Sequence, residues 1–148
     1  MSAIVAFLEG AGPDGAGRPA DEILRFDDEA LEYTHDYIQW LFPLAEASRA
    51  VPGSPVLTGA DVAAIRGSSR ARATLDAAAA RMSAFYAAGD AWLAGPDHNH
   101  LRITRIVRSL RLLAGNGAAD AFRRAILDRA AGSGDTIGAE TRRFWANA

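Results

Sequence analysis

The strongest helical pattern of the chain lies in residues 31–44, LEYTHDYIQWLFPL. The helix is predicted to begin at Asp28, because Asp27 is a good N-cap and because Asp28 and Glu29 place negative charge at the positive end of the helix dipole. Pro43 cannot continue a helix. The pattern therefore predicts one helix from Asp28 to Leu41.

Two apolar faces run along this predicted helix and leave only one polar stripe. At a period of 3.6 residues, one face holds Leu31, Thr34, His35, Ile38, Leu41 and Phe42. The second face holds Tyr33, Tyr37 and Trp40, and the polar stripe holds Glu29, Glu32, Asp36 and Gln39. A helix that is apolar over most of its circumference usually packs on more than one side, so we predict that this one is central.

The rest of the chain predicts more helices. Thr58 and Asp61 resemble a capping box for a short helix that ends near Gly67, and an alanine-rich helix follows from Ser69 to Ala88. A second strong helix, His98 to Ala114, has a buried stripe of Ile103, Ile106, Val107, Leu110 and Leu113. Further helices are expected at Ala118 to Ala131 and at Thr136 to Ala146.

Turn-forming residues separate these helices, and no alternating strand pattern or internal repeat appears. Residues 10–19 are expected to form a flexible loop, and Pro43 to Leu57 a connector. We therefore predict an all-α fold over residues 1–148, a compact single-domain bundle of about six helices. The helices at 28–41 and 98–114 are expected to pack together at its centre.

The composition sets limits on function. Of the 148 residues, 49% are hydrophobic and 23% charged, which is typical of a globular domain rather than a disordered chain. The absence of cysteine excludes disulfides, thiolate metal sites and thiol nucleophiles. The longest early apolar run, Ala3 to Leu8, is too short to span a membrane. We expect a cytoplasmic protein, and the abundance of alanine and of arginine over lysine suggests a bacterial genome.

Charge is divided unevenly along the chain. Residues 1–50 hold ten acidic and three basic residues, whereas residues 51–148 hold eight and thirteen. Arg102, Arg105, Arg108 and Arg111 follow one another at helical spacing. They could form an ion-pair ladder with the acidic stripe at 29–39, remain solvated, or bind phosphate through their guanidinium groups. Nucleic acid is not an expected partner, because the net charge is −2.

Histidines supply the residue types of a metal or acid–base site, but not its spacing. His98 and His100 are two apart and diverge on a helix, and so do the neighbours His35 and Asp36. No nucleophile motif and no phosphate loop is present. We therefore predict no catalytic residue, no metal ligand and no cofactor. A small metal-dependent or acid–base hydrolase that uses His35, Asp36, His98 or His100 remains the alternative.

Residues 31–44 and 99–113 (NHLRITRIVRSLRLL) resemble the two signature segments of the opioid growth factor receptor conserved domain. The general requirements of an α-helix do not explain the central pattern of the first segment, Tyr-x-His-Asp-Tyr-Ile-Gln-Trp-Leu-Phe-Pro. The resemblance is expected to extend from Phe26 to Trp145. The family is named for a receptor of an opioid pentapeptide growth regulator and is not built on a seven-helix membrane scaffold. We expect a bacterial member without the long C-terminal extension of the animal proteins.

The resemblance implies a peptide-binding or protein-interaction module rather than an enzyme. The leading hypothesis is a non-enzymatic binding module for a peptide, protein or small molecule. The aromatic residues near position 37 could be core or could form a pocket wall that favours a cationic group. The candidate ligand-binding residues are Tyr33, His35, Asp36, Tyr37, Gln39, Trp40, Arg102 and Arg105. Nucleic-acid or phosphate binding through the arginine helix is a further alternative.

Overall fold

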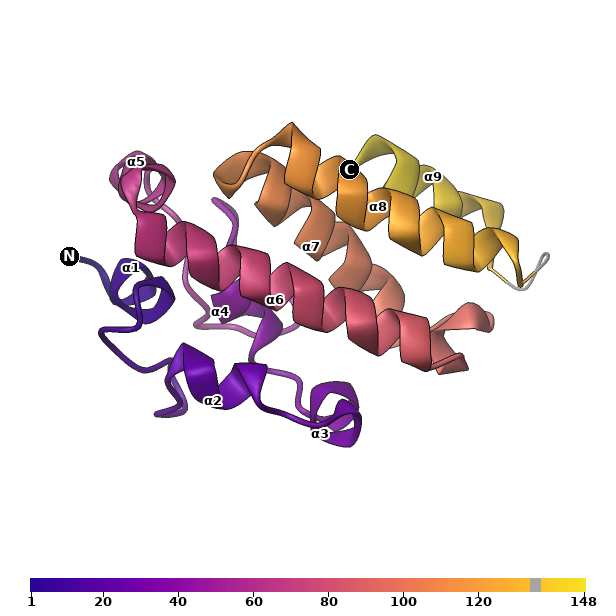
Figure 1. Cartoon of the computed structure of the whole chain (residues 1–148), viewed down its shortest axis with the longest axis horizontal. Helices are drawn as coiled ribbons and strands as arrows, with labels where there is room; N and C mark the ends of the chain where they lie inside the picture. The colour runs from indigo at the N-terminus through magenta and orange to yellow at the C-terminus, as the bar shows by residue number, and fades with distance from the viewer. Residues whose placement is uncertain (134–136) are drawn as a thin grey trace.

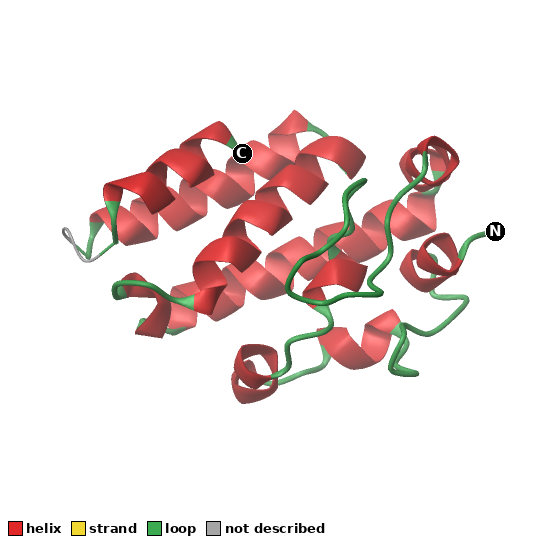
Figure 2. Ribbon diagram, turned by 180° about the vertical axis from the view of Figure 1, so that it is seen from behind, coloured by secondary structure: helices red, strands yellow, loops and turns green. Residues whose placement is uncertain are grey.

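The computed structural model describes residues 1–133 and 137–148. Within these residues it contains nine α-helices, one short 3₁₀ helix and no strand (Figures 1 and 2). The predicted all-α class is confirmed. The predicted number of helices is too low, because four short helices occupy the first 41 residues, where one was predicted.

The helices have these bounds: α1 Ala3–Leu8, α2 Ala20–Leu24, α3 Asp28–Tyr33, α4 Ile38–Leu41, α5 Gly59–Gly67, α6 Ser69–Ala88, the 3₁₀ helix η1 Ala91–Leu93, α7 His98–Leu113, α8 Asn116–Ala131 and α9 Ala139–Asn147. The predictions for α5 to α8 agree to within two residues. The predicted start of the last helix, Thr136, lies outside the described residues.

Local side-chain caps explain where several helices begin. The predicted capping box of α5 is confirmed, since the backbone N–H of Asp61 donates to the Thr58 hydroxyl (3.1 Å) and that of Thr58 to the Asp61 carboxylate (3.0 Å). Asp27 caps α3, and Asp97 caps α7. Gly115 follows α7 with φ of 106°, a conformation that favours glycine, and lets the chain turn into α8.

The long helix α6 crosses the middle of the molecule (Figure 1). Helices α7, α8 and α9 lie on one side of it and α1, α2 and α3 on the other, and α7 and α8 pack side by side. Helix α7 contacts α5, α6, α8 and α9. The predicted central position of α7 is therefore correct, its most extensive helix contact is with α8, and it also packs on residues of the segment 28–41.

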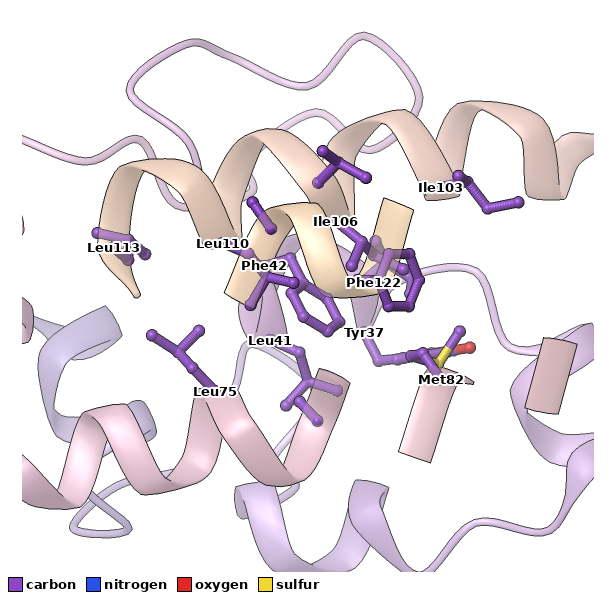
Figure 3. Close-up of a cluster of buried hydrophobic side chains, with 14 of the residues drawn as sticks. Tyr37, Leu41, Phe42, Leu75, Met82, Ile103, Ile106, Leu110, Leu113 and Phe122 are labelled. Carbon is purple, nitrogen blue, oxygen red and sulfur yellow. The ribbon is translucent and has the colours of Figure 1, made fainter. Parts of the chain in front are cut away.

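The core is built where α6, α7, α8 and the α4 segment meet (Figure 3). The predicted stripe of α7 is buried in full, and it faces Leu75 and Met82 of α6 and Phe122 of α8. Leu41 and Phe42 enter the same cluster from the α4 segment. This continuous packing fixes α7 against the segment that carries the unusual signature residues.

The predicted continuous helix from Asp28 to Leu41 is wrong. Helix α3 ends at Tyr33, the next residue is extended (φ −93°, ψ 126° at Thr34), and α4 begins only at Ile38. The periodicity of the sequence was misleading, because Leu31, Ile38 and Leu41 are all buried without sharing one helix. The side-chain contacts that stabilise this break are tertiary and come from α7.

The two predicted connectors contain no helix. Residues 43–58 are held by an isolated bridge between Leu44 and Val56. In residues 10–19 the buried carboxylate of Asp14 accepts from the backbone N–H groups of Ala16 and Arg18 and pairs with the Arg18 side chain. The flexibility of residues 10–19 stays a prediction.

Candidate functional site

The break between α3 and α4 leaves backbone carbonyls without helical partners. The Thr34 N–H closes the last turn of α3 by donating to the Ala30 carbonyl. Beyond it, the carbonyls of Leu31 and Thr34 are free of the helix ladder and face the start of α7. Buried carbonyls need partners, because an unpaired one costs about as much as a lost hydrogen bond.

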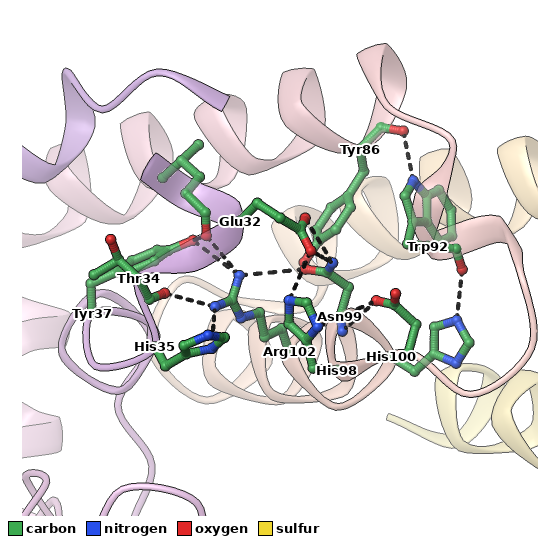
Figure 4. Close-up of polar contacts among 12 residues, drawn as sticks. Glu32, Thr34, His35, Tyr37, Tyr86, Trp92, His98, Asn99, His100 and Arg102 are labelled. Carbon is green, nitrogen blue, oxygen red and sulfur yellow. Dashed lines mark hydrogen bonds and ion pairs between the residues drawn. The ribbon is translucent and has the colours of Figure 1, made fainter. Parts of the chain in front are cut away.

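Arg102 of α7 supplies those partners (Figure 4). Its guanidinium donates from Nη1 to the Leu31 carbonyl (2.8 Å) and from Nη2 to the Thr34 carbonyl (2.7 Å). Only 8% of Arg102 is exposed, and no ion pair joins it to a carboxylate within the described residues. Its charge is instead balanced by the carbonyls at the negative end of α3.

Tyr37 completes this cap. Its hydroxyl donates to the same Leu31 carbonyl (2.7 Å), and its ring centroid lies 5.4 Å from the Arg102 guanidinium. The side chain is fully buried, and burial raises the pKa of Tyr37 to about 12. Tyr37 is thus part of the core rather than of an accessible pocket wall.

A second polar layer lies beside Arg102 and is centred on the buried Asn99 (Figure 4). The Asn99 amide donates to both Glu32 carboxylate oxygens (3.2 Å each) and accepts from the Tyr86 hydroxyl (3.0 Å). Burial raises the pKa of Tyr86. At the outer edge of this layer, His98 Nε2 lies 2.9 Å from the Glu32 carboxylate.

The histidines do not combine as an acid–base or His98–His100 metal site would need. His100 Nε2 lies 2.7 Å from the Trp92 carbonyl, away from His98. His35 Nδ1 lies 3.4 Å from Arg102, while Asp36 pairs with Arg18 at 2.8 Å. Instead, the rings of His35 and His98 meet edge to face, 5.4 Å apart.

The arginines of α7 do not form a ladder with the acidic stripe. Arg105 donates from Nε to the Phe42 carbonyl (2.9 Å), and Arg108 pairs with Glu46. Arg111 bonds to Asp120 and to the Ala148 carbonyl. The ladder hypothesis is therefore wrong, because Arg102 and Arg105 bind backbone carbonyls of residues 31–42, while Arg108 and Arg111 pair with carboxylates outside the acidic stripe.

The connector is also held by Ser109, whose buried hydroxyl donates to the Pro43 carbonyl (2.8 Å). The Arg105 side chain is partly buried, and burial lowers its pKa. Together, α7 side chains bind four backbone carbonyls of residues 31–43. Residues 31–44 and 99–113 are thus joined in space, which gives many of their unusual side chains a structural role.

The predicted site residues divide into two groups. Tyr37, Gln39 and Arg102 are buried, and Trp40 and Arg105 are partly buried, with Trp40 packed edge to face on Phe7. Tyr33 and His35 are exposed and Asp36 is half-buried. Tyr33 stands out, because 72% of it is exposed. A ligand can therefore reach Tyr33, His35 and Asp36 directly.

Sequence reasoning missed the contribution of Glu32, Asn99 and Tyr86 to the site. Glu32 was assigned only to a polar stripe, and the link from Tyr86 through Asn99 to Glu32 joins three different helices. No local spacing signals such a contact. Asp97 lies directly before the predicted helix at 98–114, a position at which aspartate is typical of an N-cap.

A second candidate surface is a groove between α7 and α9, about 450 Å³ in volume. Two large exposed apolar side chains line it, Leu101 (77% exposed) and Phe144 (59% exposed). Arg108 and Glu140 lie on its wall. Its lining is mainly apolar, so its chemistry suits an apolar side chain rather than a phosphate group.

Part of this all-α chain is similar to a known protein family. Residues 21–90 match the model of the opioid growth factor receptor (OGFr) conserved region, which is 70 of the 148 residues. Residues 21–90 are therefore similar to this conserved region, and the resemblance seen in residues 31–44 is confirmed. The matched range ends before Asn99, so the resemblance of residues 99–113 stays a prediction.

No curated protein and no solved structure matches the chain. None of the helices in residues 1–133 and 137–148 combines the length and apolar character needed to cross a bilayer.

Proposed function

We propose that the protein is a non-enzymatic binding module that binds a basic segment of a peptide or protein on the exposed face of α3. The observation that carries this proposal is the exposure of Tyr33 on an acidic helix. Tyr33 is 72% exposed, and Glu29, also exposed, precedes it by four residues. Side chains four apart lie on the same face of a helix, so the two can meet one ligand together.

The chemistry of this face suits a cationic group. Asp28 pairs with Arg81 and Glu32 bonds to Asn99, so the exposed Glu29 is the carboxylate that α3 presents beside the accessible aromatic ring. An arginine or lysine side chain can stack on the tyrosine ring while it pairs with a neighbouring carboxylate. The family name, which describes a receptor, supports a binding role.

The remaining predicted residues take supporting parts in this proposal. His35 and Asp36 extend the surface beyond the end of α3. Arg102 and Tyr37 fix that end of the helix by donating hydrogen bonds to the Leu31 carbonyl. Gln39 is buried, Trp40 packs on Phe7, and Arg105 binds the Phe42 carbonyl. A rigid support of this kind lowers the entropy cost of binding, because the accessible side chains are already in place. A bacterial origin and a cytoplasmic location remain part of the proposal.

The contacts favour this function over the two alternatives. A hydrolase built on His35 and Asp36 loses support, because the two side chains bind different partners. Phosphate binding by the arginine helix loses support as well, since Arg102, Arg105, Arg108 and Arg111 all bind groups of the chain itself. A phosphate would have to displace these partners.

The test uses a fluorescein-labelled peptide of alternating arginine and glycine, titrated with the protein in EDTA and followed by fluorescence anisotropy. We expect binding that weakens with salt, and no binding of the matched glutamate–glycine peptide. Tyr33→Ala should weaken binding by roughly 2- to 5-fold, the size of an exposed cation–π contact. Adding Glu29→Gln to this variant should weaken binding further.

Leu101→Ser is the matched control, because Leu101 is equally exposed but lies in the groove between α7 and α9. It should bind the arginine peptide as the natural protein does. Equal binding by the Tyr33→Ala variant, or loss of binding by the Leu101→Ser variant alone, would move the binding site away from α3. Failure of the natural protein to bind the arginine peptide would refute the proposed ligand class.

A further inference from the structure

Three side chains with metal-binding atoms converge where α3 meets the start of α7. Glu32, Asp97 and His98 each offer one ligand atom, and these atoms all lie within 4.8 Å of one another. Two of the residues come from the beginning of α7 and the third from α3, so only the folded chain brings them together. From this convergence we propose that Glu32, Asp97 and His98 bind a zinc ion.

The donor set fits zinc. Zinc takes imidazole nitrogen and carboxylate oxygen at roughly 2.0 to 2.2 Å, so neighbouring donors in a tetrahedral site lie about 3.3 Å apart. An imidazole binds one ion through one nitrogen, and His98 Nε2 already lies 2.9 Å from the Glu32 carboxylate. One ligand atom from each of the three residues lies within 4.8 Å of the other two, so side-chain rotations that draw these atoms together by up to about 1.5 Å place all three around one ion.

The site is open enough for an ion to enter. The His98 side chain is 42% exposed, whereas Glu32 and Asp97 are 21% and 19% exposed. The imidazole is thus the most accessible of the three ligands, while the two carboxylates are more enclosed. Two carboxylates also offset the double charge of the ion, which lowers the cost of binding it at this depth.

Asn99 holds both carboxylates in position. Its side-chain amide donates to Glu32, and its backbone N–H donates to Asp97 (2.8 Å). Asn99 is itself buried and fixed by the Tyr86 hydroxyl. Hydrogen bonds of this kind around metal ligands orient them and strengthen metal binding by about 10- to 100-fold. The structure therefore supplies the supporting contacts of a metal site as well as its ligands.

The fourth position of the ion is open to water or to His35, whose ring lies 5.4 Å from that of His98. This differs from the pairing of His98 with His100 that the sequence suggests, since His100 faces Trp92. The inference does not depend on the proposed peptide-binding function, whose first tests use Tyr33 and Glu29 and are made in EDTA.

The experiment is an isothermal titration of the EDTA-treated and dialysed protein, free of any histidine tag, with zinc chloride. We expect one ion per chain. We also expect the melting temperature to rise by roughly 5 to 10 °C when free zinc exceeds Kd about 100-fold. Cobalt should give the visible absorption bands of a tetrahedral ion.

His98→Gln and Asp97→Asn should each weaken zinc binding at least tenfold. Asparagine is also a good N-cap, so Asp97→Asn separates the loss of a ligand from the loss of α7's cap. Glu29→Gln, which removes a neighbouring exposed carboxylate, is the control and should leave zinc binding unchanged. Circular dichroism would confirm that each variant is folded. Absence of zinc binding, or unchanged binding by the folded His98→Gln variant, would overturn the proposal.

Discussion

Replacing Arg102 by methionine tests whether this residue stabilises the break between α3 and α4. The variant keeps a long side chain but loses the two hydrogen bonds to the Leu31 and Thr34 carbonyls. Hydrogen bonds from charged donors contribute about 1.5 to 3 kcal/mol each, so the two bonds together are worth roughly 3 to 6 kcal/mol.

Two effects reduce this loss. The guanidinium no longer has to be buried, and the Leu31 carbonyl keeps the Tyr37 hydroxyl as a partner. We therefore expect the free energy of unfolding to fall by about 3 kcal/mol. For a chain of this size the melting temperature should fall by roughly 6 to 12 °C.

Urea denaturation followed by circular dichroism measures the change in the free energy of unfolding, and thermal denaturation provides a second measurement. Arg108→Met is the matched control, because Arg108 lies on the same helix but is exposed and pairs with Glu46 at the surface. That control should lose less than about 1 kcal/mol. An Arg102→Met variant as stable as the Arg108→Met variant would refute the reasoning.

Two further predictions concern pH and capping. Because burial raises the pKa of Tyr37 to about 12 from its usual 10, the unfolded chain releases this proton first as pH rises. Stability should therefore fall between pH 10 and 12, by up to about 3 kcal/mol from Tyr37, and Tyr37→Phe should show a smaller fall in pH-dependent unfolding experiments; an equal fall in both proteins would contradict this. Thr58→Ala should lower the free energy of unfolding by about 1 kcal/mol in urea denaturation, whereas Thr58→Ser, which keeps the hydroxyl, should lose less; equal losses would argue against the capping box.

Part of the candidate site could be predicted from the sequence and part could not. The sequence singled out Tyr33, His35, Tyr37 and Arg102 as unusual, and the structure joins Tyr37 and Arg102 directly. It could not show that Tyr37 is fully buried while Tyr33, four residues earlier, is exposed. A continuous helix would place the two on one face, and only the break at Thr34 separates them.

The sequence by itself determined the class of fold and most of the long helices. Capping residues, glycines and apolar periodicity act over three or four residues, so the beginning of α5 at its capping box and the end of α7 near Gly115 could be read directly. The match of residues 31–44 to a known family was likewise a property of the sequence alone.

Only the tertiary structure decided how residues 28–41 fold and where their polar groups go. One of the two partners of the Leu31 carbonyl is Arg102, 71 residues further along the chain. The convergence of Glu32 with His98 depends on the same packing of α7. A helical pattern predicts backbone bonds within one segment, but a distant guanidinium that binds the freed carbonyls can make the broken conformation more stable. Such a competition between local and distant hydrogen bonds can be resolved only after the chain has folded.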